Sequence, residues 1–97
     1  MGGQMGPMEV PTRRMGGTAD AEATRIAQEL GRAVRMMREK RGWSQTRLAE
    51  AAGMTQSAVA RFEAGGTKPT LPVLERLARA LDSELVVRLA PHTDAAA

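Results

Sequence analysis

The sequence contains no cysteine and very few aromatic side chains: among its 97 residues there is one tryptophan, one phenylalanine and no tyrosine. Without cysteine the chain can form neither a disulfide framework nor a thiolate metal site, and its one histidine, His92, cannot build a zinc site alone. We therefore expect no metal and no other cofactor. No pairing of a nucleophile with a general base is recognisable and no glycine-rich phosphate loop follows a strand, so the sequence also argues against an enzyme.

Long apolar runs are missing as well. No segment approaches the length of a membrane span, and the N-terminus lacks the apolar stretch of a secretory signal, which predicts a cytoplasmic protein. What the chain does have is basic charge, with 14 lysines and arginines against 11 acidic residues and a formal net charge of +3. This balance favours a polyanionic partner.

Glycine and proline collect at the N-terminus. Residues 1–19, "MGGQMGPMEVPTRRMGGTA", hold five of the ten glycines and two of the five prolines without apolar periodicity, which is typical of a disordered arm. Arg13 and Arg14 in this arm could follow a DNA minor groove or belong to a solvated tail. We expect one folded domain at residues 20–91 and a flexible tail at 92–97.

Helical periodicity begins at Asp20 and predicts four helices. The first carries an apolar stripe and ends at Gly42; the second is capped by Ser44 and ends at Gly53. The third is capped by Thr55 and runs to Ala64, before Gly65 and Gly66; the fourth is capped by Thr70, with Pro72 in its first turn. The inward residues of the first and fourth helices are expected to be Ile26, Leu30, Val34 and Met37, and Leu74, Leu77, Ala78 and Leu81. One short strand, "ELVVRLAP", follows and is stopped by Pro91.

The second and third predicted helices have the residues of a helix-turn-helix. Such a motif needs a small residue where the helices cross, a glycine in the turn and apolar residues on the inner face of the second helix. Ala49, Gly53, Val59 and Phe62 meet these needs in that order.

The outer face of the third helix is small and polar rather than rich in Glu and Lys. At 100° per residue, Ser57, Ala60, Arg61 and Ala64 point away from the core, and Gln56 flanks them. Alanine allows a helix to sink into a major groove, and Gln, Ser and Arg can bond base edges. This face predicts a DNA-reading surface made of Gln56, Ser57 and Arg61.

Together, "LGRAVRMMREKRGW" and "SQTRLAEAAGMTQSAVARFEAGGTKPTLPVLERLARAL" resemble the phage-repressor and Cro type of helix-turn-helix domain, the Xre-like family. The resemblance covers residues 26–82 and implies a mainly α, compact four-helix lambda-repressor-like domain that binds operators as a dimer. It also implies that Gln45 bonds a phosphate and braces Gln56, and that the turn Glu63, Ala64, Gly65 replaces a turn that often has asparagine in the middle. Contacts to the DNA backbone are expected from Gln45, Thr46, Arg47, Thr55, Thr67 and Lys68.

Two features near the end of the first helix have alternative interpretations. Trp43 could stack on single-stranded nucleic acid or serve as a packing anchor between the first two helices. The basic run "REKR" at 38–41 could form a phosphate patch or simply a solvated helix end. Glu50 and Glu63 are interpreted as structural.

A single strand leaves its backbone groups unpaired and needs a partner. If two copies pair antiparallel about Val86, Glu84 of one chain faces Arg88 of the other and Leu85 faces Val87, while Leu85, Val87 and Leu89 pack on the helices. The predicted function is a dimeric repressor of transcription. The alternative is an antitoxin that neutralises a toxin and represses its own operon, because a strand in this position resembles HipB-like and HigA-like antitoxins. The dimer strand comprises Glu84, Leu85, Val86, Val87, Arg88 and Leu89.

Overall fold

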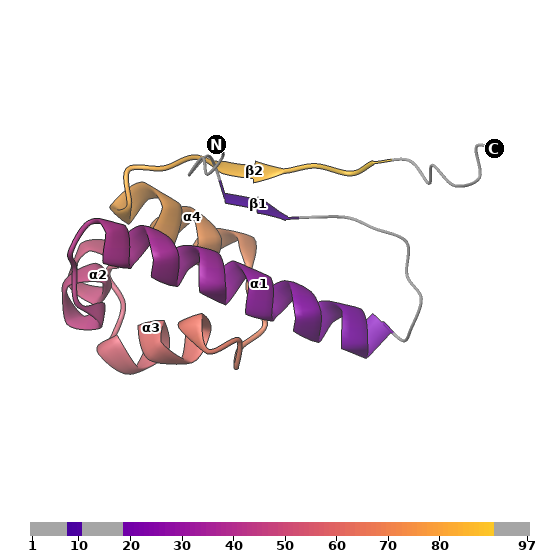
Figure 1. The fold of residues 1–97 in the computed structure, drawn as a ribbon, viewed down its shortest axis with the longest axis horizontal. Helices are drawn as coiled ribbons and strands as arrows, with labels where there is room; N and C mark the ends of the chain where they lie inside the picture. The colour runs from indigo at the N-terminus through magenta and orange to yellow at the C-terminus, as the bar shows by residue number, and fades with distance from the viewer. Residues whose placement is uncertain (1–7, 11–18, 91–97) are drawn as a thin grey trace.

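The computed structural model describes residues 8–10 and 19–90 and is mainly helical (Figure 1). The predicted fold class, a four-helix helix-turn-helix domain with a C-terminal strand, is confirmed. His92, Arg13 and Arg14 lie outside the described residues, as does the predicted tail at 92–97. The elements are β1 (Met8–Val10), α1 (Ala19–Lys40), α2 (Gln45–Ala52), α3 (Gln56–Glu63), α4 (Leu71–Ala80) and β2 (Leu85–Val87).

The predicted caps start the three shorter helices. Side-chain oxygens of Ser44, Thr55 and Thr70 accept hydrogen bonds from backbone N–H groups three residues further on, which satisfies amide donors that have no partner within the helix. Pro72 lies in the first turn of α4, where its missing N–H costs no helical hydrogen bond.

All four helices end in the same way, with one residue in the left-handed region. The N–H groups of this residue and of the next one donate hydrogen bonds to carbonyls in the last turn of the helix. At the end of α3, Gly65 has a φ of 78°, its N–H donates to the Phe62 carbonyl, and the Gly66 N–H donates to the Arg61 carbonyl. Glycine also takes this position after α1 and α2, but after α4 it is taken by Asp82, with a φ of 53°. The predicted helix ends at 42, 53 and 65 are therefore confirmed.

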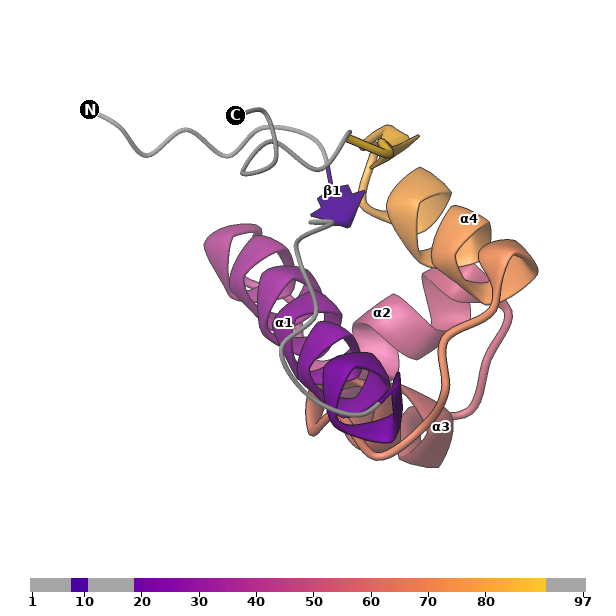
Figure 2. The ribbon, with the colours of Figure 1, turned by 90° about the vertical axis from the view of Figure 1, so that its right-hand side faces the viewer.

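The helices enclose one apolar core. The predicted stripe of α4 is fully buried, and in α1 Leu30 and Val34 are buried while Ile26 and Met37 are partly buried against them. Seen along the strands, α1 lies on one side, α4 on the other, and α2 and α3 close the core between them (Figure 2). The core residues are Leu30, Val34, Leu48, Ala49, Ala52, Val59, Phe62, Leu74, Leu77, Ala78 and Leu81.

A glycine in the middle of α1 allows α3 to approach closely. A Cβ atom on Gly31 would lie 2.4 Å from the Phe62 carbonyl oxygen and 2.7 Å from that of Glu63. Both distances are too short for any side chain, so the backbone of α1 touches the C-terminal end of α3 directly. This contact fixes where α3 ends relative to the core.

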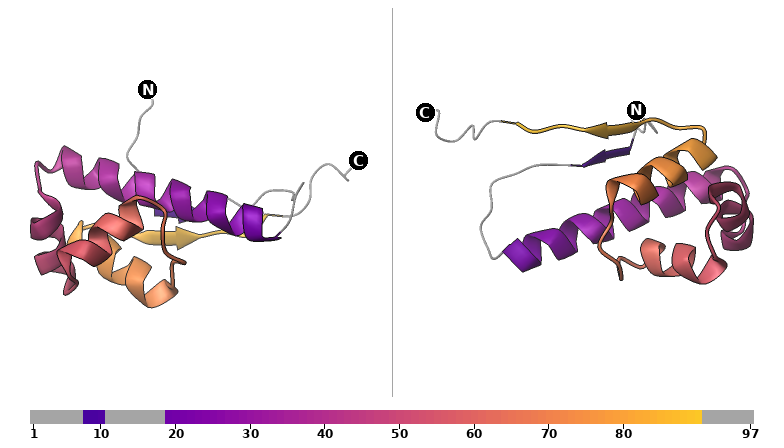
Figure 3. Two further views of the ribbon diagram at one scale, coloured as in Figure 1. Left: turned by 90° about the horizontal axis from the view of Figure 1, so that it is seen from below. Right: turned by 180° about the vertical axis from the view of Figure 1, so that it is seen from behind.

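The prediction that residues 1–19 form an arm without regular structure is wrong for Met8–Val10, which forms β1. This strand pairs in parallel with β2, in the register Met8–Leu85, Glu9–Val86 and Val10–Val87. Both strands lie on the side of the molecule opposite α3 (Figures 1 and 3). A strand of three residues is too short to show alternation in the sequence, and it forms here because β2 offers an edge with unpaired backbone groups.

The expected C-terminal strand is shorter and less buried than predicted. It spans Leu85–Val87 and already has an intrachain partner in β1. Leu85 packs on the core, but Val87 and Leu89 are 52% and 84% exposed, so the prediction that they pack on the helices is wrong. After Asp82 the chain turns back and runs alongside α4 into β2, where Leu85 and Val86 are partly buried and Val87 is exposed (Figure 1).

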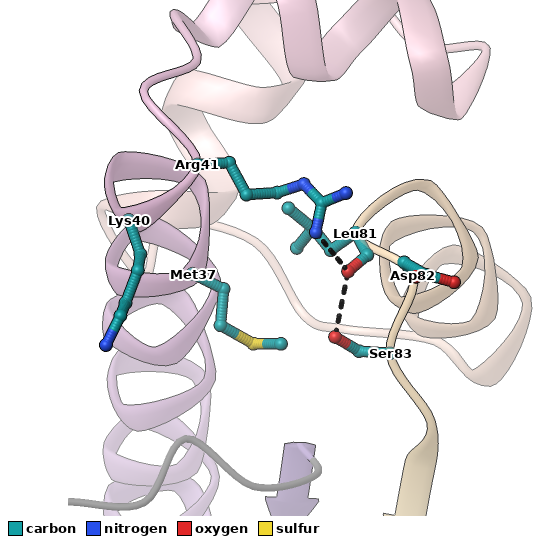
Figure 4. Close-up of a pocket in the computed structure, with 6 residues that line it drawn as sticks. All are labelled: Met37, Lys40, Arg41, Leu81, Asp82 and Ser83. Carbon is teal, nitrogen blue, oxygen red and sulfur yellow. Dashed lines mark hydrogen bonds between the residues drawn. The ribbon is translucent and has the colours of Figure 1, made fainter.

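A small hollow lies where the end of α1 meets the connection from α4 to β2 (Figure 4). Arg41 extends across it, and its Nη1 donates a hydrogen bond of 3.2 Å to the Leu81 carbonyl, which also accepts a hydrogen bond of 3.0 Å from the Ser83 hydroxyl. The bond from Arg41 holds the end of α1 to the end of α4, while the bond from Ser83 lies within the turn that follows α4. The lining residues are Met37, Lys40, Arg41, Leu81, Asp82 and Ser83.

Candidate nucleic-acid interface

Helices α2 and α3 form the predicted helix-turn-helix. Ala49 is buried where the helices cross, Gly53 has a φ of 70° in the turn, and Val59 and Phe62 are buried on the inner face of α3. The Met54 N–H donates to the Ala49 carbonyl over 2.8 Å, which closes the turn. Each of the four residues thus has the structural role that the sequence predicted.

The opposite face of α3 is open to solvent. Gln56, Ser57 and Arg61 are exposed, as is Ala64, whereas Ala60 is half-buried rather than fully outward. Gly66 lies close to the Arg61 stem: a Cβ on Gly66 would be 3.3 Å from its Cγ. The three predicted base-reading side chains are therefore all exposed, and other elements of the described chain leave the outer side of α3 uncovered (Figure 3).

Gln56 does not project freely from this surface. Its Nε2 donates a hydrogen bond of 2.8 Å to Oε1 of Gln45, the first residue of α2. The bracing that the family resemblance implied is present. A side chain held in this way loses less conformational entropy when it bonds a ligand.

The brace continues inward to a buried ion pair. Nε2 of Gln45 donates to Oε1 of Glu63 over 3.1 Å, and Nη2 and Nε of Arg38 donate to the two Glu63 oxygens over 3.0 and 2.6 Å. The third arm of the guanidinium, Nη1, donates to the Trp43 carbonyl over 2.8 Å. The side chains of Arg38 and Glu63 are only 11% and 4% exposed, so a charge left alone here would be costly.

The ion pair corrects one prediction and confirms another. Arg38, the first residue of the basic run 38–41, is neither a phosphate contact nor a solvated helix end, because it is buried against Glu63. Hydrogen bonding to Glu63 raises the pKa of Arg38, and the negative charges of Glu63 and Glu39 add to this, whereas burial acts in the opposite direction. The structural interpretation of Glu63 is confirmed.

Trp43 is a packing anchor. It is partly buried against the core at the junction of α1 and α2, and the guanidinium carbons of Arg41 and Arg47 lie 5.0 Å from its ring centroid. Cations at this distance from an indole ring are attracted by its electrons. The indole ring of Trp43 therefore makes its contacts with side chains of the same chain.

The predicted backbone contacts flank α3 at the starts of two helices and in the following loop. Thr46, Arg47, Thr55 and Lys68 are exposed, while Gln45 and Thr67 are half-buried. Thr55 Oγ1 accepts from the Ala58 N–H and so acts as the cap of α3, which leaves its hydroxyl hydrogen available. The six assignments to the DNA backbone stay predictions.

The close contact at Gly31 and the pairing of Arg38 with Glu63 were not predicted from the sequence. A signal for the pair exists, because Arg38 continues the buried stripe of Leu30 and Val34 at intervals of four residues, and Glu63 directly follows Phe62. Two opposite charges on two inward faces favour a buried pair. For Gly31, the signal is a lone glycine inside a helical pattern, which often marks a close contact.

In the described part of the chain, no helix has the length and apolar character needed to cross a membrane. No group of three or more His, Cys, Asp or Glu within residues 8–10 and 19–90 is arranged to hold a metal ion.

The sequence and the fold were compared with known proteins. The sequence model described as "Helix-turn-helix" matches residues 34–87, from the last third of α1 to the end of β2. The HTH-type transcriptional regulator SutR of Escherichia coli (strain K12) is 30% identical over 70 residues, which are 72% of this chain and 39% of SutR. The chain therefore spans well under half the length of this relative.

A solved structure shares the fold at comparable identity. It is the restriction-modification controller protein C.AhdI from Aeromonas hydrophila, which matches with a TM-score of 0.58 and 34% sequence identity. The match covers 60% of this chain and 88% of C.AhdI. The match thus takes in most of that protein and somewhat more than half of this chain.

Proposed function

This chain belongs to the helix-turn-helix family of DNA-binding transcriptional regulators, and we propose that it is a homodimeric repressor that recognises an operator through α3 in the major groove. The observation that carries the proposal is the exposed face of α3, where Gln56, Ser57 and Arg61 lie together and Gln56 is braced by Gln45. Gln can bond adenine and Arg can bond guanine in two places each, which provides sequence discrimination. Bound at a promoter in the cytoplasm, such a protein represses by occupying the site, without catalysis or a cofactor.

The second part of the proposal is a dimer through β2. One edge of β2 is taken by β1, and the second edge can pair antiparallel with β2 of another copy, which would give the strand order β1, β2, β2, β1. The exposed Val87 and Leu89 supply apolar surface at this edge. Because the strands and α3 lie on opposite sides, this pairing leaves both α3 helices uncovered, to meet major grooves about 34 Å apart (Figure 3).

The proposal is tested by selecting binding sites from a random duplex library and then measuring variants on the selected site. Gln56→Ala and Arg61→Ala should each lose about 1–3 kcal/mol of base discrimination, with little change in melting temperature, because both side chains are exposed. Lys68→Ala serves as the comparison: it should weaken binding to all sequences and lower the slope of log K against log salt by about one. Failure of the wild-type protein to enrich any sequence would refute operator recognition.

An antitoxin is the second candidate function, favoured by the same exposed apolar residues at β2. In that case Val87 and Leu89 would bind a toxin, and DNA binding would serve autoregulation. Expression together with the neighbouring reading frame separates the two functions. If the product of the neighbouring reading frame is toxic and is silenced by this chain, but not by its Leu89→Glu variant, the antitoxin function is supported. A harmless product would favour the repressor function.

A further inference from the structure

The hydrogen-bond chain from Arg38 to Gln56 has a fixed direction, which follows from the chemistry of its members. A carboxylate bound by a guanidinium can only accept hydrogen bonds, so Gln45 must turn its NH₂ group toward Glu63. The carbonyl oxygen of Gln45 then faces Gln56, and Gln56 must in turn present its own NH₂ group to that oxygen. The charge on Glu63 therefore decides which way round both amides are held.

This direction determines what Gln56 presents to a ligand. One of its two N–H groups is used by Gln45, which leaves the second N–H and the carbonyl oxygen side by side in one order. If both amides were turned over, the donor and the acceptor would change places. Adenine offers an acceptor at N7 and a donor at N6 in a fixed arrangement, so a Gln with a fixed order can match it and a freely flipping Gln matches it only part of the time.

We propose that Glu63 is a specificity-determining residue that acts through Gln45 and Gln56 without touching DNA, by fixing the order in which Gln56 presents its donor and acceptor to an adenine. This inference rests on the proposed function, because it requires that Gln56 contact a base. Glu63 is well placed for the role: its side chain is 4% exposed, and its backbone is held by the close approach of Gly31. In the described part of the chain no buried side-chain nitrogen or oxygen lacks a hydrogen-bond partner. No unsatisfied buried group in this part therefore competes with Glu63 for the amide of Gln45.

The experiment compares binding to the selected operator with binding to versions changed at one base pair. The relevant base pair is the one at which Gln56→Ala loses its preference. There we expect the wild-type protein to discriminate by about 5- to 150-fold. Removing the charge on Glu63 without leaving a buried charge alone requires the double variant Arg38→Met, Glu63→Gln, since a neutral pair replaces a buried ion pair at little cost. In this variant discrimination at that base pair should fall to within about threefold, whereas discrimination at other positions is kept.

Two further variants keep the test decisive. Arg38→Lys retains a cation beside Glu63 and should retain the wild-type preference. Gln45→Met interrupts the chain at a half-buried position, without disturbing the ion pair, and should lose the preference even if the double variant does not fold. A role of Glu63 in stability alone would lower the melting temperature and the affinity for all sequences and leave the preference unchanged.

The outcomes distinguish failure of the proposed role of Glu63 from failure of the proposed operator recognition. A folded double variant, or a folded Gln45→Met variant, with undiminished preference at that base pair would overturn the role of Glu63 while leaving operator recognition intact. If Gln56→Ala changes the preference at no position, then Gln56 contacts no base, and both this inference and the assignment of α3 fall.

Discussion

The residues of α3 have two kinds of role: some pack into the core, and others are exposed to solvent. Val59 and Phe62 are buried, and Glu63 joins them through Arg38, whereas Gln56 and Arg61 are exposed. The sequence predicted that Val59 and Phe62 are buried and that Gln56 and Arg61 are exposed, because this pattern follows from 100° steps along a helix. The connection between Glu63 and Gln56 runs through Gln45 of another helix, α2, and periodicity within one helix cannot reveal it.

Asp82 is a residue whose replacement should stabilise the protein. Its φ of 53° is unfavourable for any residue with a Cβ, and its carboxylate lies at the negative end of α4. Asp82→Gly removes both costs, so we expect about 1 kcal/mol of added stability, or a melting temperature higher by roughly 4–8 °C. Thermal denaturation followed by circular dichroism measures this. Asp82→Ala is the matched control, because it removes the charge but keeps the Cβ; an equal gain in both variants would show that backbone strain is not the cause.

At the scale of elements, the helices and the existence of β2 were predictable, whereas β1 and the burial of β2 were not. Caps at Ser44, Thr55 and Thr70, glycines after the helices and apolar stripes are local signals, and all four helices agree with them within a few residues. β1 has three residues and depends on a partner 77 positions away in the sequence, so no local pattern marks it. The inward faces of β2 were mispredicted for a similar reason, because alternation says which residues share a face but not whether anything covers that face.

The crossing of α1 and α3 supplies a prediction at this scale. In Gly31→Ala the new Cβ would meet the Phe62 carbonyl oxygen at 2.4 Å, and backbone on both sides must move. We expect the free energy of unfolding to fall by about 1–3 kcal/mol, although alanine favours a helix over glycine by about 1 kcal/mol. Urea denaturation followed by the fluorescence of Trp43, the only tryptophan, measures the change. Arg32→Ala, at the exposed neighbouring position, should be close to neutral, and a Gly31→Ala variant as stable as the wild-type protein would mean that the helices do not touch there.

For the whole molecule, the main feature is the separation of two surfaces. The exposed face of α3 lies on one side, and the strand pair with its exposed Val87 and Leu89 lies on the other (Figure 1). The helical domain between them holds both in place, since α1 contacts α3 as well as β1. Under the proposed function, this separation would let the dimer form without blocking α3, because neither surface covers the other.

The proposed dimer makes a prediction that depends on its symmetry. With the two β2 strands antiparallel about Val86, Glu84 of each copy faces Arg88 of the other, so the same ion pair occurs twice. Glu84→Arg alone places two arginines opposite each other, and Arg88→Glu alone places two glutamates together. Loss of two pairs, at about 0.2–1 kcal/mol each, should raise the dimer dissociation constant by a factor of roughly two to thirty in either variant. The double variant Glu84→Arg, Arg88→Glu restores both pairs in reverse and should dimerise like the wild-type protein. Sedimentation equilibrium at low salt measures all four proteins, and circular dichroism confirms that each is folded. The two single variants change the net charge in opposite directions, so weakening in both of them, with rescue in the double variant, cannot arise from a general effect of charge. Unchanged dimerisation in both single variants, or a double variant weaker than either, would rule out this register.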